Sequence, residues 1–371
     1  MYKNDKTKGG ITMYPRLVID TAKLRSNIDA IAEITKNQGG CSLMIVTKAL
    51  CADENVVKMI AQHPAVDYVA DSRIQNIKKN YETVQANGKQ SVLLRLPMAS
   101  EIEDVVKYVD ISFNSEMATL EMLNAEAAKQ GKVHKAVLMI DVGDLREGIF
   151  FQNEEEIIET AKKIQAMENV ELYGVGVNLT CYGAIIPKND NLSIICEFAE
   201  KIEAATGAKL TMVSGGNSSS IYLVGKGELP EKINNLRLGE AFLLGNDTAY
   251  GTTLPGTVDD ALTLEAQIVE LKEKPSLPIG EVGVDAFGQK PYYEDRGIIK
   301  RAIIAIGQQD MDRDSMYPLD ENVDVLGASS DHMLLDVTRG DYKVGDIVTF
   351  KLGYGSVLKT ATSEYVAKEY K

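Results

Sequence analysis

The chain has 371 residues, of which 44% are hydrophobic and 25% are charged, a composition typical of a globular protein with a substantial core. Its formal net charge of −14 argues against nucleic acid and anionic membrane surfaces as main partners. The sequence has no apolar run of the roughly 18 residues that a membrane span needs, and its polar N-terminus has no signal-peptide core. Four scattered cysteines without a C-x-x-C pair, and only three histidines, lead us to expect a reducing cytoplasm and no metal site.

Residues 1–13 are mostly polar, and we expect them to form a disordered lead. A short strand is expected at 14–20, packed with a C-terminal β domain. Short apolar runs, often β-branched, then alternate with segments of helical spacing. The runs predict buried strands at Leu43–Thr47, Tyr68–Ala70, Val92–Leu96, Val109–Phe113, Ala136–Asp141, Leu172–Val177, Leu210–Val213 and Leu236–Leu244.

Helices are expected between these strands. Thr21 can cap the first of them, in which Leu24 and Ile28 repeat at helical spacing. The others are expected over 53–61, 72–86, 115–129, 153–167 and 192–205. Eight strands with intervening helices over residues 21–248 favour an α/β fold of the (β/α)8 TIM-barrel type. A doubly wound sheet remains the alternative, because periodicity alone does not separate the two.

The residue pattern of the sequence changes after residue 248. Helical periodicity fades, and Gly and Pro turns separate strand-like runs. These runs are Leu262–Leu271, Gly297–Ala305, Met333–Val337 and Ile347–Leu352. The pattern predicts a separate β domain over residues 249–371.

The residues that carry chemistry in a barrel lie where its strands end. Lys48 follows the first strand, where partial desolvation would favour the neutral amine that forms a Schiff base. The ordinary alternative is a solvated lysine at a strand end. Arg146, in a glycine-containing loop after the fifth strand, can hold a carboxylate or can pair with a neighbouring acid, Asp144 or Glu147.

The seventh and eighth strands carry an anion-binding pattern. The seventh runs into the segment 214–220 (SGGNSSS), whose backbone N–H groups and hydroxyls can cradle a phosphate at a helix start, or simply cap that helix. Arg237 is flanked by apolar residues and is expected to be buried against a fixed acceptor. Gly239 lets a phosphate approach the backbone. With Lys48, these features point to a phosphorylated carbonyl cofactor such as pyridoxal phosphate.

In these motifs the sequence resembles the alanine racemase family, fold-type III pyridoxal-phosphate enzymes built from a barrel and a C-terminal β domain. The segments 245–252 (GNDTAYGT) and 327–332 (GASSDH) are most similar to its ornithine racemase-like branch. The resemblance implies an amino-acid racemase, an isomerase that exchanges the α-proton between two bases, with ornithine as its first expected substrate. It also implies a homodimer in which the β domain of one subunit helps to close the site of the other.

The resemblance also assigns residues. It places the cofactor lysine at Lys48, the arginine facing the pyridine nitrogen at Arg237, and the substrate-carboxylate arginine at Arg146. Asn178 stands where the family has a histidine under the cofactor ring. The phosphate site falls on Asn217 and Ser218, the backbone near Gly239 and Glu240, and Tyr354 in the last β segment.

The second base is the main departure from the family. The family's tyrosine corresponds to Gln308, and a glutamine does not exchange a proton near neutral pH. His332 and Cys181 are the leading candidates, followed by Tyr182, and each is also explained as a turn histidine, a packed cysteine or a rim tyrosine. Acidic residues of the β domain, Asp331 and Asp310 with Asp285, are candidates to meet a cationic substrate side chain.

Other functions remain open at this point. The first is a racemase of another amino acid: alanine, lysine or a broad set. A decarboxylase of the family usually places a cysteine in the β domain, whereas all four cysteines here precede residue 200. A lyase of this shape usually adds a metal site, for which histidines are lacking. A non-catalytic pyridoxal-phosphate-binding protein generally has the barrel alone.

Overall fold

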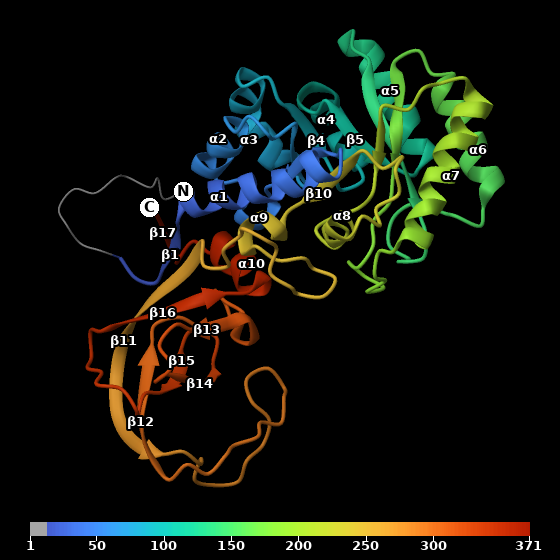
Figure 1. Cartoon of the computed structure of the whole chain (residues 1–371). Coiled ribbons are helices and arrows are strands. Elements are labelled where there is room, and N and C mark those ends of the chain that lie inside the picture. Colours follow the sequence, from blue (N-terminus) through green and yellow to red (C-terminus); the bar gives the residue numbers. More distant parts are fainter. Residues whose placement is uncertain (1–12) are drawn as a thin grey trace. The chain divides into compact units, whose positions relative to one another are not determined.

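The computed structural model describes residues 13–371 and divides them into two compact units (Figure 1). One unit is Thr21–Asp259, and the other combines the described residues before Thr21 with Asp260–Lys371. The lead predicted over residues 1–13 lies outside the described residues except for Met13. The first unit ends later than residue 248 because the backbone of Val258 exchanges hydrogen bonds with the Asn27 side chain, at 2.8 and 2.9 Å.

The unit Thr21–Asp259 is built on a closed parallel barrel. Its strands are β2 (Ser42–Val46), β3 (Tyr68–Asp71), β4 (Gln90–Leu93), β5 (Ile111–Asn114), β6 (His134–Asp141), β8 (Val170–Gly176), β9 (Met212–Ser214) and β10 (Asn235–Leu238). They pair in the order β5-β4-β3-β2-β10-β9-β8-β6, and the pairing of β5 with β6 closes the ring. A short strand, β7 (Ile149–Phe150), adds to β6. The barrel prediction is confirmed, and the doubly wound alternative is wrong.

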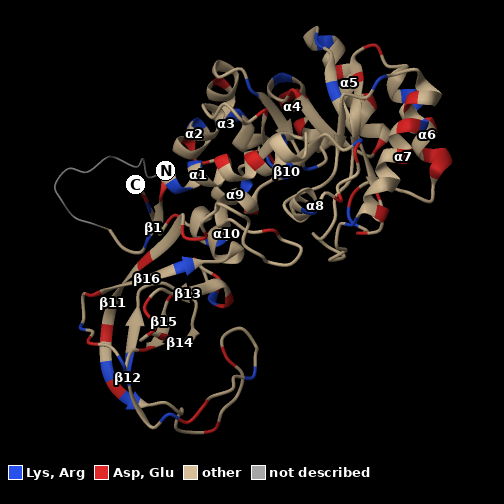
Figure 2. Ribbon diagram, viewed as in Figure 1, with Lys and Arg blue, Asp and Glu red and all other residues tan. Residues whose placement is uncertain are grey.

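Helices surround this barrel (Figure 1). They are α1 (Thr21–Ala32), α2 (Glu54–Ala61), α3 (Ile74–Ala86), α4 (Ile102–Tyr108), α5 (Met117–Gln130), α6 (Glu154–Gln165), α7 (Asn189–Thr206), α8 (Ile221–Lys226) and α9 (Glu240–Leu244). In α6 the first turn has three glutamates and the last turn two lysines, which complements the helix dipole (Figure 2). None of the helices described between residues 13 and 371 has both the length and the apolar composition to cross a membrane.

The interior of the barrel is packed with side chains. Strand residues that point inward form one buried cluster, which includes Met44, Phe113, Val137 and Met139. Such filling is usual for a barrel of this size, and it leaves the strand ends as the place for a binding site.

The last predicted strand, Leu236–Leu244, is wrong in its second half. The strand ends at Leu238, the chain turns at Gly239, and α9 follows. Residues Ala241–Leu244 are all buried. A short run that is apolar on every side has no periodicity that could distinguish a buried strand from a buried helix.

The second unit is a mostly antiparallel sheet. Its strands are β1 (Arg16–Ile19), β11 (Leu262–Pro275), β12 (Ile298–Ile304), β13 (Met316–Pro318), β14 (Asp324–Ala328), β15 (Met333–Asp336), β16 (Ile347–Leu352) and β17 (Ala367–Tyr370). The main path runs β13-β16-β11-β12-β15-β14, and β1 lies between β11 and β17. One helix, α10 (Tyr354–Thr362), follows β16.

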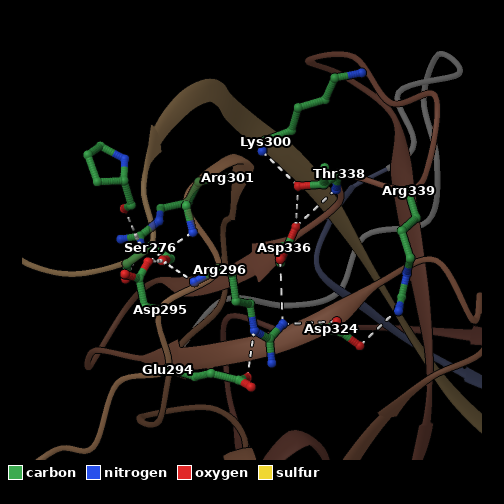
Figure 3. A network of polar contacts seen from close by, with 12 residues as sticks. Ser276, Glu294, Asp295, Arg296, Lys300, Arg301, Asp324, Asp336, Thr338 and Arg339 are labelled. Carbon is green, nitrogen blue, oxygen red and sulfur yellow. Dashed lines mark hydrogen bonds and ion pairs between the residues drawn. The ribbon is translucent and has the colours of Figure 1, made fainter.

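An ion-pair network holds the ends of the long connection between β11 and β12 (Figure 3). The Arg296 guanidinium lies 3.1 Å from Asp324, 3.5 Å from Asp336 and 3.0 Å from Glu294. Its backbone N–H donates to the Ser276 hydroxyl at 2.8 Å. The connection carries apolar side chains that are almost fully exposed, among them Ile279 and Tyr292.

Candidate active site

Four neighbouring strand ends of the barrel carry the residues that the sequence singled out. In register, Leu238 of β10 pairs with Ile45 of β2, and Asn235 of β10 pairs with Ser214 of β9. Ser214 also pairs with Gly176 of β8. Because parallel strands end at the same edge of a barrel, Lys48, Gly239, Ser218 and Asn178 follow these strands on one side of the unit.

Lys48 opens a one-turn helix directly after β2. Its side chain is exposed, whereas Thr47 and Ala49 on either side are buried, which fits the alternative of a solvated lysine at a strand end. The turn ends in two residues with positive φ, Cys51 at 52° and Ala52 at 45°. Such a backbone costs about 1–2 kcal/mol for each non-glycine residue, and it persists where the surroundings hold it.

The serine segment after β9 meets the start of α9. The buried Ser218 hydroxyl accepts hydrogen bonds from the backbone N–H groups of Gly239 at 3.3 Å and Ala241 at 3.1 Å. These two N–H groups fix the Ser218 oxygen at the start of a helix and leave the hydrogen of its hydroxyl as a donor for an anion such as phosphate. Burial raises the pKa of Glu240 there, although the Asn246 amide and the Lys48 charge act in the opposite direction.

Arg237 is buried within the barrel end, as predicted, and its acceptors are neutral. Its guanidinium donates to the Ser214 hydroxyl at 2.7 Å and to the Val177 carbonyl at 2.8 Å, and its Cζ lies 5.1 Å from the centre of the Phe113 ring. Burial lowers its pKa to about 10, so the group keeps its proton at neutral pH. A buried cation with uncharged partners is a costly arrangement that is typical of a functional site.

Asn178 and Cys181, on the loop after β8, belong to the same cluster. The Asn217 amide donates to the Asn178 Oδ1 at 3.1 Å and to the Cys181 sulfur at 3.3 Å, and the thiol lies 3.6 Å from the Asn178 Oδ1. Within residues 13–371, the buried Asn178 Nδ2 has no hydrogen-bond partner. Cys181 is exposed, as is Tyr182, whose side chain points to solvent. The structure thus brings Cys181, but not the tyrosine ring, to the polar cluster.

Arg146 is paired with its neighbour. Its guanidinium contacts the Glu147 carboxylate, which is the alternative that the sequence left open. Burial alone would lower the pKa of Arg146. The hydrogen bond to Glu147 and its negative charge outweigh this effect, so the pKa of Arg146 is raised above its ordinary value. A substrate carboxylate therefore has to compete with Glu147 for this guanidinium.

Asp144, which sequence reasoning did not assign to the site, joins two of its loops. Its fully buried carboxylate accepts backbone N–H groups of Tyr182 at 3.0 Å, Gly183 at 3.1 Å and Ile185 at 3.4 Å. A Cβ on Gly183 would lie 2.8 Å from the Asp144 carbonyl oxygen, so only glycine fits there. The local sequence did carry a signal for this role of Asp144, because an acidic residue in a glycine-rich loop commonly accepts hydrogen bonds from backbone N–H groups.

The remaining candidates lie in the β unit. His332 Nδ1 is 3.0 Å from the Asp331 carboxylate, and this contact lowers the pKa of Asp331, so the acid is charged. Asp310 accepts the Ser363 hydroxyl at 2.7 Å. The segment of Gln308 lies against that of Asp331, because a Cβ on Gly307 would be 2.3 Å from the Asp331 nitrogen. The structure therefore gathers the sequence segments of His332, Asp331, Asp310 and Gln308.

Tyr354 was expected in the last β segment, and that placement is wrong. It is the first residue of α10, directly after β16 and Gly353. The helix was hidden from the sequence because Gly355 and several hydroxyl residues weaken its helical propensity.

A polar cluster at the strand ends of a closed parallel barrel is the arrangement of a barrel enzyme. Residues 19–247 match the family model for the alanine racemase N-terminal domain. The chain is 55% identical to the ornithine racemase of Acetoanaerobium sticklandii, over 96% of this chain and 99% of that protein. It is 37% identical to the lysine racemase of Thermotoga maritima, again over 96% of this chain and 99% of that protein.

The fold agrees with these matches. A crystal structure of alanine racemase from Bartonella henselae with covalently bound pyridoxal phosphate has a TM-score of 0.70 at 18% identity, over 96% of this chain and 99% of that one. The chain belongs to the alanine racemase family.

Proposed function

We propose that this protein is a pyridoxal-phosphate-dependent isomerase, an amino-acid racemase that interconverts L- and D-ornithine. The observation that carries the proposal is the set of chemical groups at adjoining strand ends: an exposed amine at Lys48, a hydroxyl with two N–H donors at Ser218, and a buried cation at Arg237. The identity of 55% to an ornithine racemase along almost the whole chain supports ornithine as the substrate.

These residues fit pyridoxal phosphate. Ser218, whose oxygen is held by the N–H groups of Gly239 and Ala241, would supply its hydroxyl as a donor for the phosphate. Arg237 would face the ring nitrogen, Asn178 would lie by the ring with its unpartnered Nδ2, and Lys48 would hold the aldehyde carbon. Asn217 orients Asn178, and Tyr354 is proposed as a further phosphate donor from the β unit.

When bound, pyridoxal phosphate withdraws electrons from the α-carbon of an attached amino acid and so makes its α-proton removable. Lys48 is the group that takes or returns this proton on one face. Arg237 keeps its own proton at neutral pH, because even its lowered pKa is about 10. If Arg237 faced the ring nitrogen, its guanidinium would donate to that nitrogen without giving up a proton and would thereby disfavour side reactions such as transamination.

Inversion requires a second proton-exchanging group on the opposite face, and we propose Cys181 and His332 as its candidates. Cys181 is supported by the position of its sulfur in the Asn178–Asn217 cluster, where the Asn217 amide donates to it at 3.3 Å. His332 is supported by its contact with Asp331 and its place beside the Gln308 segment. The test is α-deuterium incorporation in D2O from each enantiomer by C181A and H332A. Loss of the true second base abolishes exchange from one enantiomer and leaves it with the other, whereas full racemisation by both variants rules out both assignments.

For the substrate side chain, Asp331 and Asp310 offer negative charge to a terminal ammonium. Lysine is the second candidate, because of the 37% identity to a lysine racemase. The direct test incubates the holoprotein with each L-amino acid and separates the enantiomers by chiral chromatography. We expect the highest kcat/KM for ornithine. Turnover of alanine but not of ornithine or lysine would contradict the assignment.

We further propose a homodimer that works in a reducing cytoplasm. The four cysteines are free thiols, and exposed apolar residues such as Ile279 and Tyr292 on the β11–β12 connection suit a surface that is covered in an assembly. If the β domain of one subunit completes the site of the other, mixed dimers of K48A and H332A subunits contain one site with neither substitution. Activity that returns on mixing two inactive variants supports a shared site, and a monomer by light scattering contradicts it.

A further inference from the structure

We propose that Asp71 and Asn80 are positioning residues for Lys48, which hold the two ends of its turn through Thr47 and Ala52. This inference rests on the proposed role of Lys48 as the cofactor lysine and proton carrier. Neither Asp71 nor Asn80 belongs to the cluster described above, and both lie behind the turn, on β3 and α3.

The first set of contacts that fixes the turn lies at its start. The Thr47 hydroxyl lies 2.7 Å from the Asp71 Oδ2 and 3.1 Å from the Ala70 carbonyl, and the Thr47 N–H donates to the same carbonyl at 2.8 Å. Thr47 and Asp71 are both buried. The residue before Lys48 is thus fixed to the end of the neighbouring strand by both backbone and side chain.

Asp71 is itself fixed. Its Oδ1 accepts the Arg73 N–H at 2.9 Å and the Asn76 amide at 3.0 Å. Burial raises the pKa of Asp71, while these donors and Thr47 act in the opposite direction. A buried carboxylate that accepts three donors is a rigid anchor, because movement of Thr47 would leave a buried acceptor without its donor.

The second set of contacts that fixes the turn lies at its end. The buried Asn80 amide donates to the Ala52 carbonyl at 2.9 Å and also to the Asn76 carbonyl at 3.3 Å. Ala52 and Cys51 are the two residues with positive φ, and Asp53 caps α2 directly after them through the N–H groups of Asn55 and Val56. The strained end of the turn is therefore clamped between Asn80 and the start of α2.

The consequence is for the position of the lysine rather than for its charge. Lys48 has a long, exposed and flexible side chain, so the place of its amine depends on where the turn holds its Cα. Backbone strain that is clamped from outside the reacting groups is a recognised means of holding a functional residue. If Thr47 or Ala52 is released, the turn can relax to ordinary φ values and carry the amine away from its target.

The experiment compares T47V with T47S, and N80A with wild type. T47V keeps the shape of threonine but loses the hydroxyl, whereas T47S keeps the hydroxyl and is the matched control. Each protein is stripped of cofactor and mixed with pyridoxal phosphate, and the rate of covalent attachment is followed by absorbance. Binding of pyridoxamine phosphate, which has no aldehyde and reports the phosphate site alone, is measured in parallel with kcat, KM and thermal unfolding.

We expect T47V and N80A to slow attachment and lower kcat by about tenfold or more, since small misplacements of a reacting group have effects of this size. Pyridoxamine phosphate affinity and KM should stay at the wild-type values, and T47S should behave as wild type. If T47V does not fold, the attachment rate and kcat of N80A test the positioning role instead. Attachment and kcat at wild-type values in a folded variant overturn the positioning role, as does equal impairment of T47S and T47V. Failure of wild type itself to attach the cofactor at Lys48 overturns the proposed function instead.

Discussion

The phosphate-binding role of Ser218 can be tested by a single hydroxyl deletion. In S218A the N–H groups of Gly239 and Ala241 lose the oxygen that accepts them at 3.3 and 3.1 Å, and a bound phosphate loses one hydroxyl donor. A hydrogen bond to a charged group contributes about 1.5–3 kcal/mol. Since each 1.4 kcal/mol is tenfold, the Kd for pyridoxamine phosphate should rise by roughly ten- to a hundredfold.

The neighbouring serine supplies the control. The Ser219 hydroxyl is also buried, but it has no hydrogen-bond partner among residues 13–371. Removing an unsatisfied polar group is neutral or stabilising, so S219A should bind the cofactor as wild type does. The assay is fluorescence titration of the stripped protein at constant ionic strength. Equal weakening in both variants, or none in S218A, refutes a phosphate site at Ser218.

Three further predictions concern stability, each measured by urea unfolding. D144A leaves three loop N–H groups without their carboxylate and should lower the free energy of unfolding by about 2–4 kcal/mol. A free energy of unfolding equal to that of the wild type would refute the role of Asp144 in joining the two loops. His134 is buried, and burial lowers its pKa to about 4. Between pH 6.5 and 4 the unfolded chain therefore binds a proton before the folded chain does, and the free energy of unfolding should fall by about 3 kcal/mol as the pH falls through this range. H134Q should lose this pH dependence. R296Q removes a half-exposed network and should cost at most about 1 kcal/mol, a difference that 1 M salt should abolish.

The sequence was informative where a strand end could be located. Lys48 and the serine segment 214–220 were singled out because each follows a short buried apolar run, and Arg237 because apolar residues flank it. Asn178 and the choice of Ser218 within its segment came from the family resemblance. The closed barrel brings these strand ends together. The buried state of Arg237 was predicted from its apolar neighbours, and the structure confirms it. Such local patterns survive folding because the strand itself defines which edge its last residue reaches.

Other features depend on contacts that no local pattern contains. The turn that begins at Lys48 ends in two positive-φ residues, Cys51 and Ala52, and neither residue type signals such a backbone. The link from Thr47 to Asp71 requires the register of β2 against β3. An acid that closes β3 beside a lysine after β2 was a signal, but it gains meaning only once the strands are known to be neighbours.

The attachment of the cofactor to Lys48 is tested most directly by borohydride reduction of the holoprotein followed by peptide mass spectrometry. A stable phosphopyridoxyl label is predicted on the peptide that contains Lys48, and K48A should yield none. A label on a different lysine of the wild-type chain, or an unlabelled protein, would contradict the site and the reaction built on it.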